Sequence, residues 1–392
     1  MATKPAYRFA IFAFAFVAAT ALAKPYLPTD DATVLERLPE KIDPSLAELK
    51  RQRTALARSP GDAALAAALA RRAIEAARET GDPRFLGQAQ AALAPWWKAL
   101  EVPAPILVLR ATVKQSQHDF PGALADLDQL LKARPGDGQA LLTRATVLTV
   151  QGRYDEAKRD CARLTRVAAE IVTTACLASP ASLSGNADSA YRGVVQALAR
   201  TAGADAGVVA WVSTLAAEIA ARRGDTMASD AHFRTALAAD PRDAYTRGAY
   251  ADFLLDGGRP AEVVTMLADE TRNDALLLRL ALAEARIPEM KAAFDTHRAD
   301  LAARFDASRQ RGDTVHRREE ARFRLDLEHD ASGALALARA NWEVQREPAD
   351  LRILAESARG AGDAATLRIA SDWIAVHRLE DRRVVALTGA QP

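Results

Sequence analysis

The sequence is poor in the residue types that carry most enzyme and metal chemistry. Of its 392 residues, 2 are cysteine and 6 are histidine. There is no His-x-x-x-His pair, no glutamate at zincin spacing and no glycine loop ending in Lys-Ser or Lys-Thr. The segment Ser182-Leu183-Ser184-Gly185 lacks the leading glycine and the strand of a serine nucleophile turn. We therefore expect no catalytic residues, no metal site and no cofactor.

An excess of charge of one sign is missing as well. The chain has 52 Lys and Arg against 51 Asp and Glu, a formal net charge of +1. Binding to a phosphate backbone requires a basic surface, so we expect no nucleic-acid partner. The Arg-rich stretch 297–324 also carries acidic residues. This mixture is typical of a solvated helix face with i,i+4 pairs, and a basic docking site is the alternative.

Long apolar runs are missing except at the N-terminus. There a basic start precedes an apolar run over residues 9–22, and Ala21 and Ala23 form the small-x-small cleavage motif. This layout predicts a secretory signal peptide over residues 1–23, with an uncleaved membrane anchor as the alternative. We expect a bacterial protein that is periplasmic or secreted, with no membrane span after cleavage. The bacterial origin is inferred from the signal peptide and the Ala- and Arg-rich, Lys-poor composition.

Strand patterns are absent too, and alanine is abundant, which predicts an all-α fold. Residues 24–44 hold several prolines and indicate an irregular lead-in. After it, turn signals separate helical segments at intervals near 34 residues. These signals are Gly81-Asp82-Pro83, His118-Asp119, Gly152-Arg153, Gly185-Asn186, Gly224-Asp225 and Gly258-Arg259. Glycine tolerates the left-handed geometry of such turns, and aspartate caps the helix that follows.

One tetrapeptide shows the same period directly. Arg-Ala-Thr-Val occupies residues 110–113 and returns at residues 144–147. A repeat of this length indicates a helix-turn-helix unit that buries its apolar face only by stacking on copies of itself. We expect about eight or nine antiparallel helix pairs. They divide into repeats over 45–270 and divergent repeats with a C-terminal cap over 271–384, followed by a tail over 385–392.

These units resemble the tetratricopeptide repeat. Small residues and turn residues stand at the signature positions of two consecutive units: Ala111, Ala123 and Pro135, then Ala145, Gly152, Tyr154 and Ala157. The family's first-helix tryptophan is replaced by Leu107 and Leu141. The resemblance implies a right-handed superhelical solenoid in which the first helix of each pair lines a concave binding face. The small residues allow the two helices of a pair to cross closely.

The two cysteines flank one of the expected turns. Cys161 lies late in one helix and Cys176 early in the next, at nearly equal distances from the turn near residues 168–169. On antiparallel helices they would stand at the same height. Since an exported protein meets an oxidising compartment, we predict a structural disulfide between them. Two buried free thiols are the main alternative, and a redox or metal role is a further one.

The pair Trp96-Trp97 follows Pro95 near the end of an expected helix. One interpretation is an exposed aromatic platform for a glycan or peptide. The interpretation we favour is that one or both tryptophans seal the joint between neighbouring repeats. Tryptophan offers a large apolar area for either role.

The expected concave face provides the binding candidates. At the groove positions of the resembling family stand Thr112, Gln115, Gln139, Leu142, Thr146, Thr149, Trp211, Glu218, Tyr245 and Asp252. This groove begins uncharged and becomes aromatic and acidic. Thr112 and Thr146 replace the asparagine of the basic clamp with which some members hold a terminal carboxylate. We therefore expect a protein partner or an extended peptide that is neutral or basic.

The sequence thus favours an exported scaffold that binds a protein or extended peptide non-covalently on its concave face. The alternative is a cell-envelope assembly or chaperone-like accessory that acts through its ends or as an oligomer. An enzyme is the third and least favoured class, because the sequence shows no constellation of nucleophile, base and stabilising group. The partner, the pathway and the oligomeric state are left open.

Overall fold

The computed structural model describes residues 44–201 and 203–389, and every regular element in these ranges is helical. This confirms the all-α prediction for that part of the chain. The predicted signal peptide with Ala21 and Ala23, the lead-in up to residue 43 and the last three residues of the tail lie outside the described residues. No helix within the described ranges is long and apolar enough to cross a membrane.

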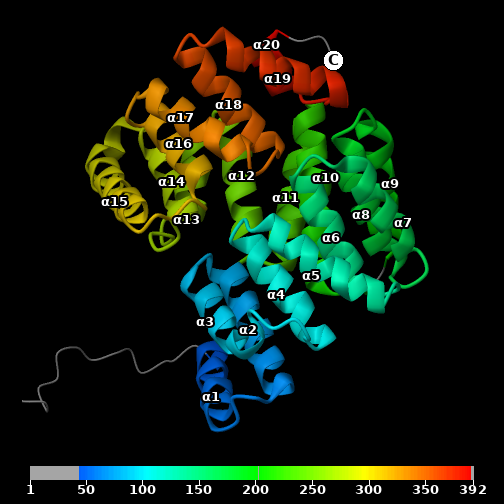
Figure 1. The fold of residues 1–392 in the computed structure, drawn as a ribbon. Coiled ribbons are helices and arrows are strands. Elements are labelled where there is room, and N and C mark those ends of the chain that lie inside the picture. The colour runs from blue at the N-terminus through cyan, green and yellow to red at the C-terminus, as the bar shows by residue number, and fades with distance from the viewer. Residues whose placement is uncertain (1–43, 202, 390–392) are drawn as a thin grey trace, which may run out of the picture. The chain divides into compact units, whose positions relative to one another are not determined.

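Twenty α-helices and two short 3-10 helices follow one another along the described chain (Figure 1). In order they are α1 (Pro44–Arg58), α2 (Ala63–Thr80), α3 (Arg84–Ala92), η1 (Ala94–Trp96), α4 (Ala104–Ser116), α5 (Phe120–Ala133), α6 (Gly138–Val150), α7 (Tyr154–Leu164), α8 (Glu170–Ser182), α9 (Ala187–Arg200), α10 (Ala206–Arg223), α11 (Thr226–Ala239), α12 (Ala244–Asp256), α13 (Pro260–Leu267), α14 (Asp274–Glu284), η2 (Pro288–Met290), α15 (Lys291–Gln310), α16 (Arg317–Asp326), α17 (Ala331–Trp342), α18 (Pro348–Gly360), α19 (Ala364–His377) and α20 (Arg382–Thr388).

From α2 onward, each even-numbered helix packs against the odd-numbered helix that follows it, up to α18 and α19. The even-numbered helices, which we call the first helices, also contact one another from α2 through α20, so they form a continuous row. In the two best-formed pairs, α4 begins at Ala104 and α6 at Gly138, and α5 begins at Phe120 and α7 at Tyr154. Both offsets are 34 residues, the period of the tetrapeptide.

Aspartate begins many of these helices, because its carboxylate accepts the backbone N–H groups that a helix start leaves unpaired. Asp119 caps α5 in this way, Asp137 caps α6 and Asp225 caps α11. Gly224 ends α10 in the left-handed region, at φ +82°. Glycine and aspartate therefore act at these turns as expected: glycine adopts the left-handed backbone, and aspartate caps the next helix.

Small buried residues belong to the apolar core that these helix pairs share. Ala111, Ala123 and Ala157 have no exposed surface, and Ala145 is 2% exposed. Leu107 and Leu141, which replace the family's tryptophan, belong to the same apolar core cluster. A larger side chain at the alanines would force the helix axes apart.

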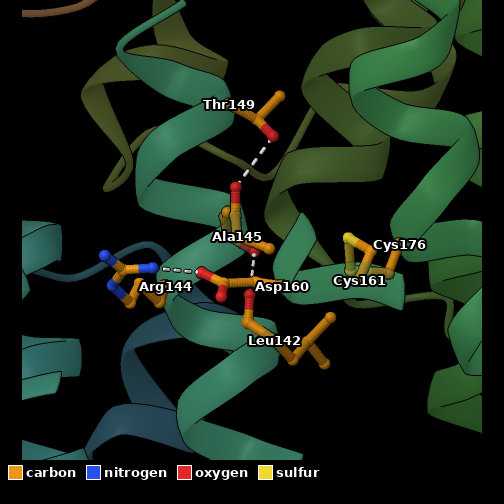
Figure 2. Close-up of a disulfide and its surroundings, with 8 residues drawn as sticks. Leu142, Arg144, Ala145, Thr149, Asp160, Cys161 and Cys176 are labelled. Carbon is orange, nitrogen blue, oxygen red and sulfur yellow. Dashed lines mark hydrogen bonds and ion pairs between the residues drawn. A yellow bond between two sulfur atoms is a disulfide. The ribbon is translucent and has the colours of Figure 1, made fainter. Parts of the chain in front are cut away.

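The repeated arginine of the tetrapeptide forms a repeated ion pair. Arg110 donates from Nε and Nη2 to the carboxylate of Asp126 at 2.8 and 2.6 Å, with both side chains 5% exposed. Arg144 donates to Asp160 at 2.6 Å, as Figure 2 shows. Each pair joins the first helix of a repeat unit to its second helix. Sequence reasoning recognised the repeated arginine and missed this role, although both aspartates also stand 34 residues apart.

The two cysteines lie on α7 and α8, which pack side by side. Their sulfur atoms are 1.94 Å apart and their Cα atoms 5.4 Å apart, as a disulfide requires (Figure 2). Cys161 is fully buried and Cys176 is 4% exposed. The link joins two consecutive pairs, in the arrangement predicted from the position of the turn.

The C-terminal helices return to the middle of the row. The Arg346 N–H, just before α18, donates to the Val150 carbonyl at the end of α6 at 2.7 Å. Tyr154 and Leu183 share an apolar core cluster with residues of α16 to α20. The helix α20, red in Figure 1, contacts α10. The C-terminal helices therefore close the expected groove along this part of the row.

Candidate functional site

A cavity of about 360 Å³ lies where the C-terminal helices meet the middle of the row. Its wall is built mainly by first helices, from α6 through α20. The lining combines apolar side chains with many charged ones. The charged ones are Glu218, Arg222, Asp252, Asp256, Arg279, Arg318, Glu319, Arg322, Glu347, Arg352, Glu356, Asp381 and Arg383. This charged interior is the most distinctive chemical feature of the concave face.

Asp252 on α12 holds two arginines from later helices. Arg279 on α14 donates to it at 2.8 Å, and Arg322 on α16 forms a second ion pair. Burial alone would raise the pKa of Asp252, but the two guanidinium groups outweigh it and hold that pKa well below its usual range. Asp252 is therefore charged and neutralised within the chain.

Asp256, one helical turn further along α12, forms ion pairs with α18 and α20, the final two helices of the row. Arg352 on α18 donates to both of its carboxylate oxygens, at 2.7 and 2.8 Å. Arg383 on α20 forms another ion pair with the same carboxylate, which is only 11% exposed. Bidentate pairs of this kind are among the stronger ion pairs in proteins. The acidic end of the expected groove thus binds arginines of the chain's own C-terminal region.

Arg318 on α16 is a third charged centre of the wall. It donates to Glu347 at 2.9 Å, to Glu319 at 3.2 Å and to Asp350 at 3.4 Å. Burial would raise the pKa of Glu319, but the Arg318 guanidinium lowers it to about 2. This group of charges is also compensated internally.

Glu218 and Arg222 on α10 differ from these pairs. The Tyr245 hydroxyl donates to Glu218 Oε1 at 2.6 Å, and Arg222 Nη2 donates to the Ser182 hydroxyl at 2.9 Å. Neither charge has an ion-pair partner among the described residues. Burial raises the pKa of Glu218 above its usual value. Each charge therefore faces the cavity with only a neutral hydroxyl bonded to it.

Four of the predicted groove residues line the cavity: Thr149, Glu218, Tyr245 and Asp252. The others are not part of this lining: Thr112, Gln115, Gln139, Leu142, Thr146 and Trp211. Trp211 is 38% exposed on α10. The hydroxyls of Thr112, Thr146 and Thr149 donate to carbonyls four residues earlier in their own helices. These hydroxyls therefore have no proton left to donate to a ligand.

Sequence reasoning missed the arginines of the cavity wall. It treated the stretch 297–324 as a solvated face, whereas Arg318 and Arg322 line the cavity and pair with its carboxylates. Both lie on a first helix, and so do Arg279 and Arg352. Assigning first helices in the divergent repeats as well would have placed these arginines on the concave face.

Trp96 and Trp97 lie in the first part of the array, away from this cavity. Both are partly buried and pack against the core cluster formed by α2, α3 and α4. Arg110 also donates to the Trp96 carbonyl. This placement fits the interpretation that the tryptophans seal a joint between repeats.

No protein-family model matches the chain, and no curated protein matches it. Solved structures that align with it include a tetratricopeptide repeat protein from Parabacteroides merdae, at 14% identity over 74% of this chain and 98% of that one, with a TM-score of 0.38. Human IFIT1, solved as a dimer with m7Gppp-AAAA, aligns at 14% identity over 87% of this chain and 85% of that one, with a TM-score of 0.40.

The tetratricopeptide repeat domain of P58(IPK) aligns at 14% identity over 82% of this chain and 96% of that one, with a TM-score of 0.24. Alignments this weak carry no argument about function. The chain's own pairing of helices at a 34-residue period is the observation that matches the predicted architecture. On that evidence the molecule is an all-helical array of pairs like those of the tetratricopeptide repeat.

Proposed function

We propose that this protein is an exported scaffold that binds a polypeptide partner non-covalently at the concave side of its first helices. The observation that carries the proposal is the cavity between α6 and α20, at about 360 Å³. Ligand sites in proteins commonly measure about 300–1,000 Å³ and combine apolar walls with a few placed polar groups. A segment of a partner, and not a whole domain, fits this space.

The lining suits reversible binding. Tyr245 lines the cavity and is 60% exposed, so it offers an aromatic contact to an entering segment. Leu215, Leu278 and Ile353 provide apolar wall around the charged groups.

A photo-crosslinking experiment tests this proposal. A benzophenone amino acid replaces Tyr245 in one variant and Met227, an 84% exposed residue on α11, in a control variant. We expect a specific crosslinked protein from position 245 and none from position 227 in intact producing cells. Equal capture at both positions, or no capture at position 245, would refute binding of a polypeptide partner at the cavity.

Export is part of the proposal and has its own test. The predicted signal peptide supports it, and so does the pairing of the cysteines, because disulfides persist mainly in oxidising compartments. We expect the mature protein in the periplasmic or secreted fraction, with an N-terminus near residue 24. A full-length protein that stays in the cytoplasmic fraction would contradict export.

The assembly or chaperone-like alternative is favoured by one surface. On α19, near the C-terminal end of the row, Ile369 is 50% exposed and Val376 is 75% exposed. Exposed apolar residues of this kind often mark contacts with other proteins. Light scattering on the purified protein separates the two functions, since a stable oligomer supports assembly and a monomer supports the scaffold.

A further inference from the structure

Glu218 and Arg222 stand four residues apart on α10, in the order that normally produces an ion pair on a helix. They do not form one. Glu218 accepts a hydrogen bond from the Tyr245 hydroxyl at 2.6 Å, while Arg222 donates to the Ser182 hydroxyl at 2.9 Å. Each side chain is thus held by a neutral partner on a different helix, α12 for Glu218 and α8 for Arg222.

Most other charges of the described cavity wall are matched by an opposite charge. The three carboxylate centres Asp252, Asp256 and Glu347 each have at least one arginine partner. Asp381 accepts the backbone N–H groups of Arg383 and Val384 at the start of α20. By contrast, the Arg222 Nε–H is buried and has no hydrogen-bond partner among the described residues. A buried donor without a partner is uncommon in a folded protein and calls for an explanation.

We infer that Glu218 and Arg222 bind a ligand group that carries both charges, an ammonium at Glu218 and a carboxylate at Arg222. Tyr245 and Ser182 orient the two side chains toward the cavity. The inference rests on the proposed function in that it uses the same cavity. A single unpaired arginine suits a singly charged carboxylate, whereas a phosphate dianion would leave surplus negative charge beside Glu218.

The spacing limits the size of this group. Side chains four residues apart on a helix have Cβ atoms about 5–6 Å from each other. Two extended residues of a peptide span about 7 Å. The matching chemistry comes from one of two sources, which are a free amino acid or dipeptide, or a polypeptide segment with neighbouring basic and acidic side chains.

Calorimetric titration of the full mature protein with four small probes tests the inference. Gly-Gly carries both charges, acetyl-Gly-Gly carries only the carboxylate, and Gly-Gly-amide carries only the ammonium. Acetyl-Lys-Glu-amide represents a polypeptide segment. We expect the native protein to bind Gly-Gly or acetyl-Lys-Glu-amide at least tenfold more tightly than either singly charged probe. Preference for Gly-Gly identifies the free zwitterion as the source, and preference for acetyl-Lys-Glu-amide identifies the segment.

Variants assign the two charges. Arg222→Gln removes the advantage of Gly-Gly over Gly-Gly-amide, and Glu218→Gln removes its advantage over acetyl-Gly-Gly. If acetyl-Lys-Glu-amide is preferred, both variants reduce its affinity tenfold or more. Arg368→Gln, at an exposed arginine on α19, is the matched control and binds as the native protein does. Ser182→Ala keeps every cavity charge and weakens binding of the preferred probe, because Arg222 loses its orienting partner.

Two outcomes would overturn the inference. One is that the native protein binds none of the four probes or binds all of them equally. The other is that Arg222→Gln and Glu218→Gln, shown to be folded by circular dichroism, keep the native preference. Capture at position 245 is read separately. Crosslinking at position 245 without a preference for the doubly charged probes rejects this inference alone. A preference for those probes without crosslinking rejects the polypeptide partner alone.

Discussion

Individual carboxylates explain why the acidic end of the concave face is not free to bind a basic partner. Asp252 and Asp256 lie one turn apart on α12, and each holds two arginines that belong to α14, α16, α18 or α20. The expected basic segment is therefore supplied by the chain itself. In the described part of the cavity wall, Glu218 and Arg222 have no ion-pair partner and are bonded only to neutral hydroxyls.

Replacement of Asp256 by asparagine tests the strength of this attachment. The variant leaves Arg352 and Arg383 without their shared anion in a largely buried setting, so we expect a loss of about 1–3 kcal/mol in the free energy of unfolding. Urea denaturation measures it. Asp155→Asn, at a carboxylate that is 92% exposed, is the control and changes stability by less than about 0.5 kcal/mol. Equal losses in the two variants would contradict the role of Asp256.

His118 predicts a specific dependence of stability on pH. Burial lowers its pKa to about 4, and the positive charge of Arg318 adds to the effect. Because the unfolded chain takes up this proton near pH 6.5 and the folded chain only near pH 4, stability falls as the pH drops through that interval. The contribution is at most about 3 kcal/mol, from about 1.4 kcal/mol for each pH unit.

The measurement compares the native protein with His118→Asn at pH 7 and pH 4.5. Asparagine tolerates the backbone angle at this turn, φ +59°. We expect the variant to lose less stability between the two pH values than the native protein does. The same loss in both proteins would show that His118 is not buried as a neutral side chain.

At the scale of elements, the turns between paired helices contact the C-terminal region in succession. Gly152, between α6 and α7, lies against Trp373 on α19. The corresponding glycines of the next two pairs, Gly185 and Gly224, lie against Arg378 and Arg382. Trp373 also packs edge-on against Tyr154 and Trp342. The closure thus combines apolar packing along the turns with ion pairs at the cavity.

Two glycine variants separate backbone strain from this packing. Gly152 and Gly362 have nearly the same left-handed backbone, φ +74° and +69°, but an added Cβ overlaps Trp373 only at Gly152. We expect Gly152→Ala to cost roughly 1–2 kcal/mol more than Gly362→Ala in denaturant unfolding. In a Trp373→Ala background the two costs become equal. A cost that is the same in the native background would mean that the turn does not touch α19.

The disulfide links the two best-formed units to the rest of the row. Cys161 and Cys176 close a loop with a sequence separation of 15. In the chain-entropy account, such a loop stabilises the folded state by about 3 kcal/mol. We expect Cys161→Ser with Cys176→Ser to lower the denaturation midpoint by a corresponding amount. If the protein with both cysteines, unfolded without a reducing agent, titrates two free thiols, the disulfide is contradicted.

For the whole molecule, local signals predicted the helices well. Glycine and aspartate at the turns marked where the helices of the repeats begin and end. The predicted groove positions Glu218, Tyr245 and Asp252 do line the cavity. Local signals could not predict that the C-terminal helices contact the middle of the row. Asp256 pairs with residues 96 and 127 positions away, and that contact depends on curvature accumulated over several pairs.

Closure of the row is the central claim, and disulfide trapping tests it most directly. The Arg346 N–H donates to the Val150 carbonyl at 2.7 Å, so this contact brings cysteines introduced at the two positions close together. Val150→Cys with Arg346→Cys should form a crosslink under mild oxidation, seen as a mobility shift on non-reducing gels. The control pair, Val150→Cys with Arg368→Cys, should keep two titratable thiols. If the first pair also keeps both thiols under these conditions, the closed arrangement is wrong.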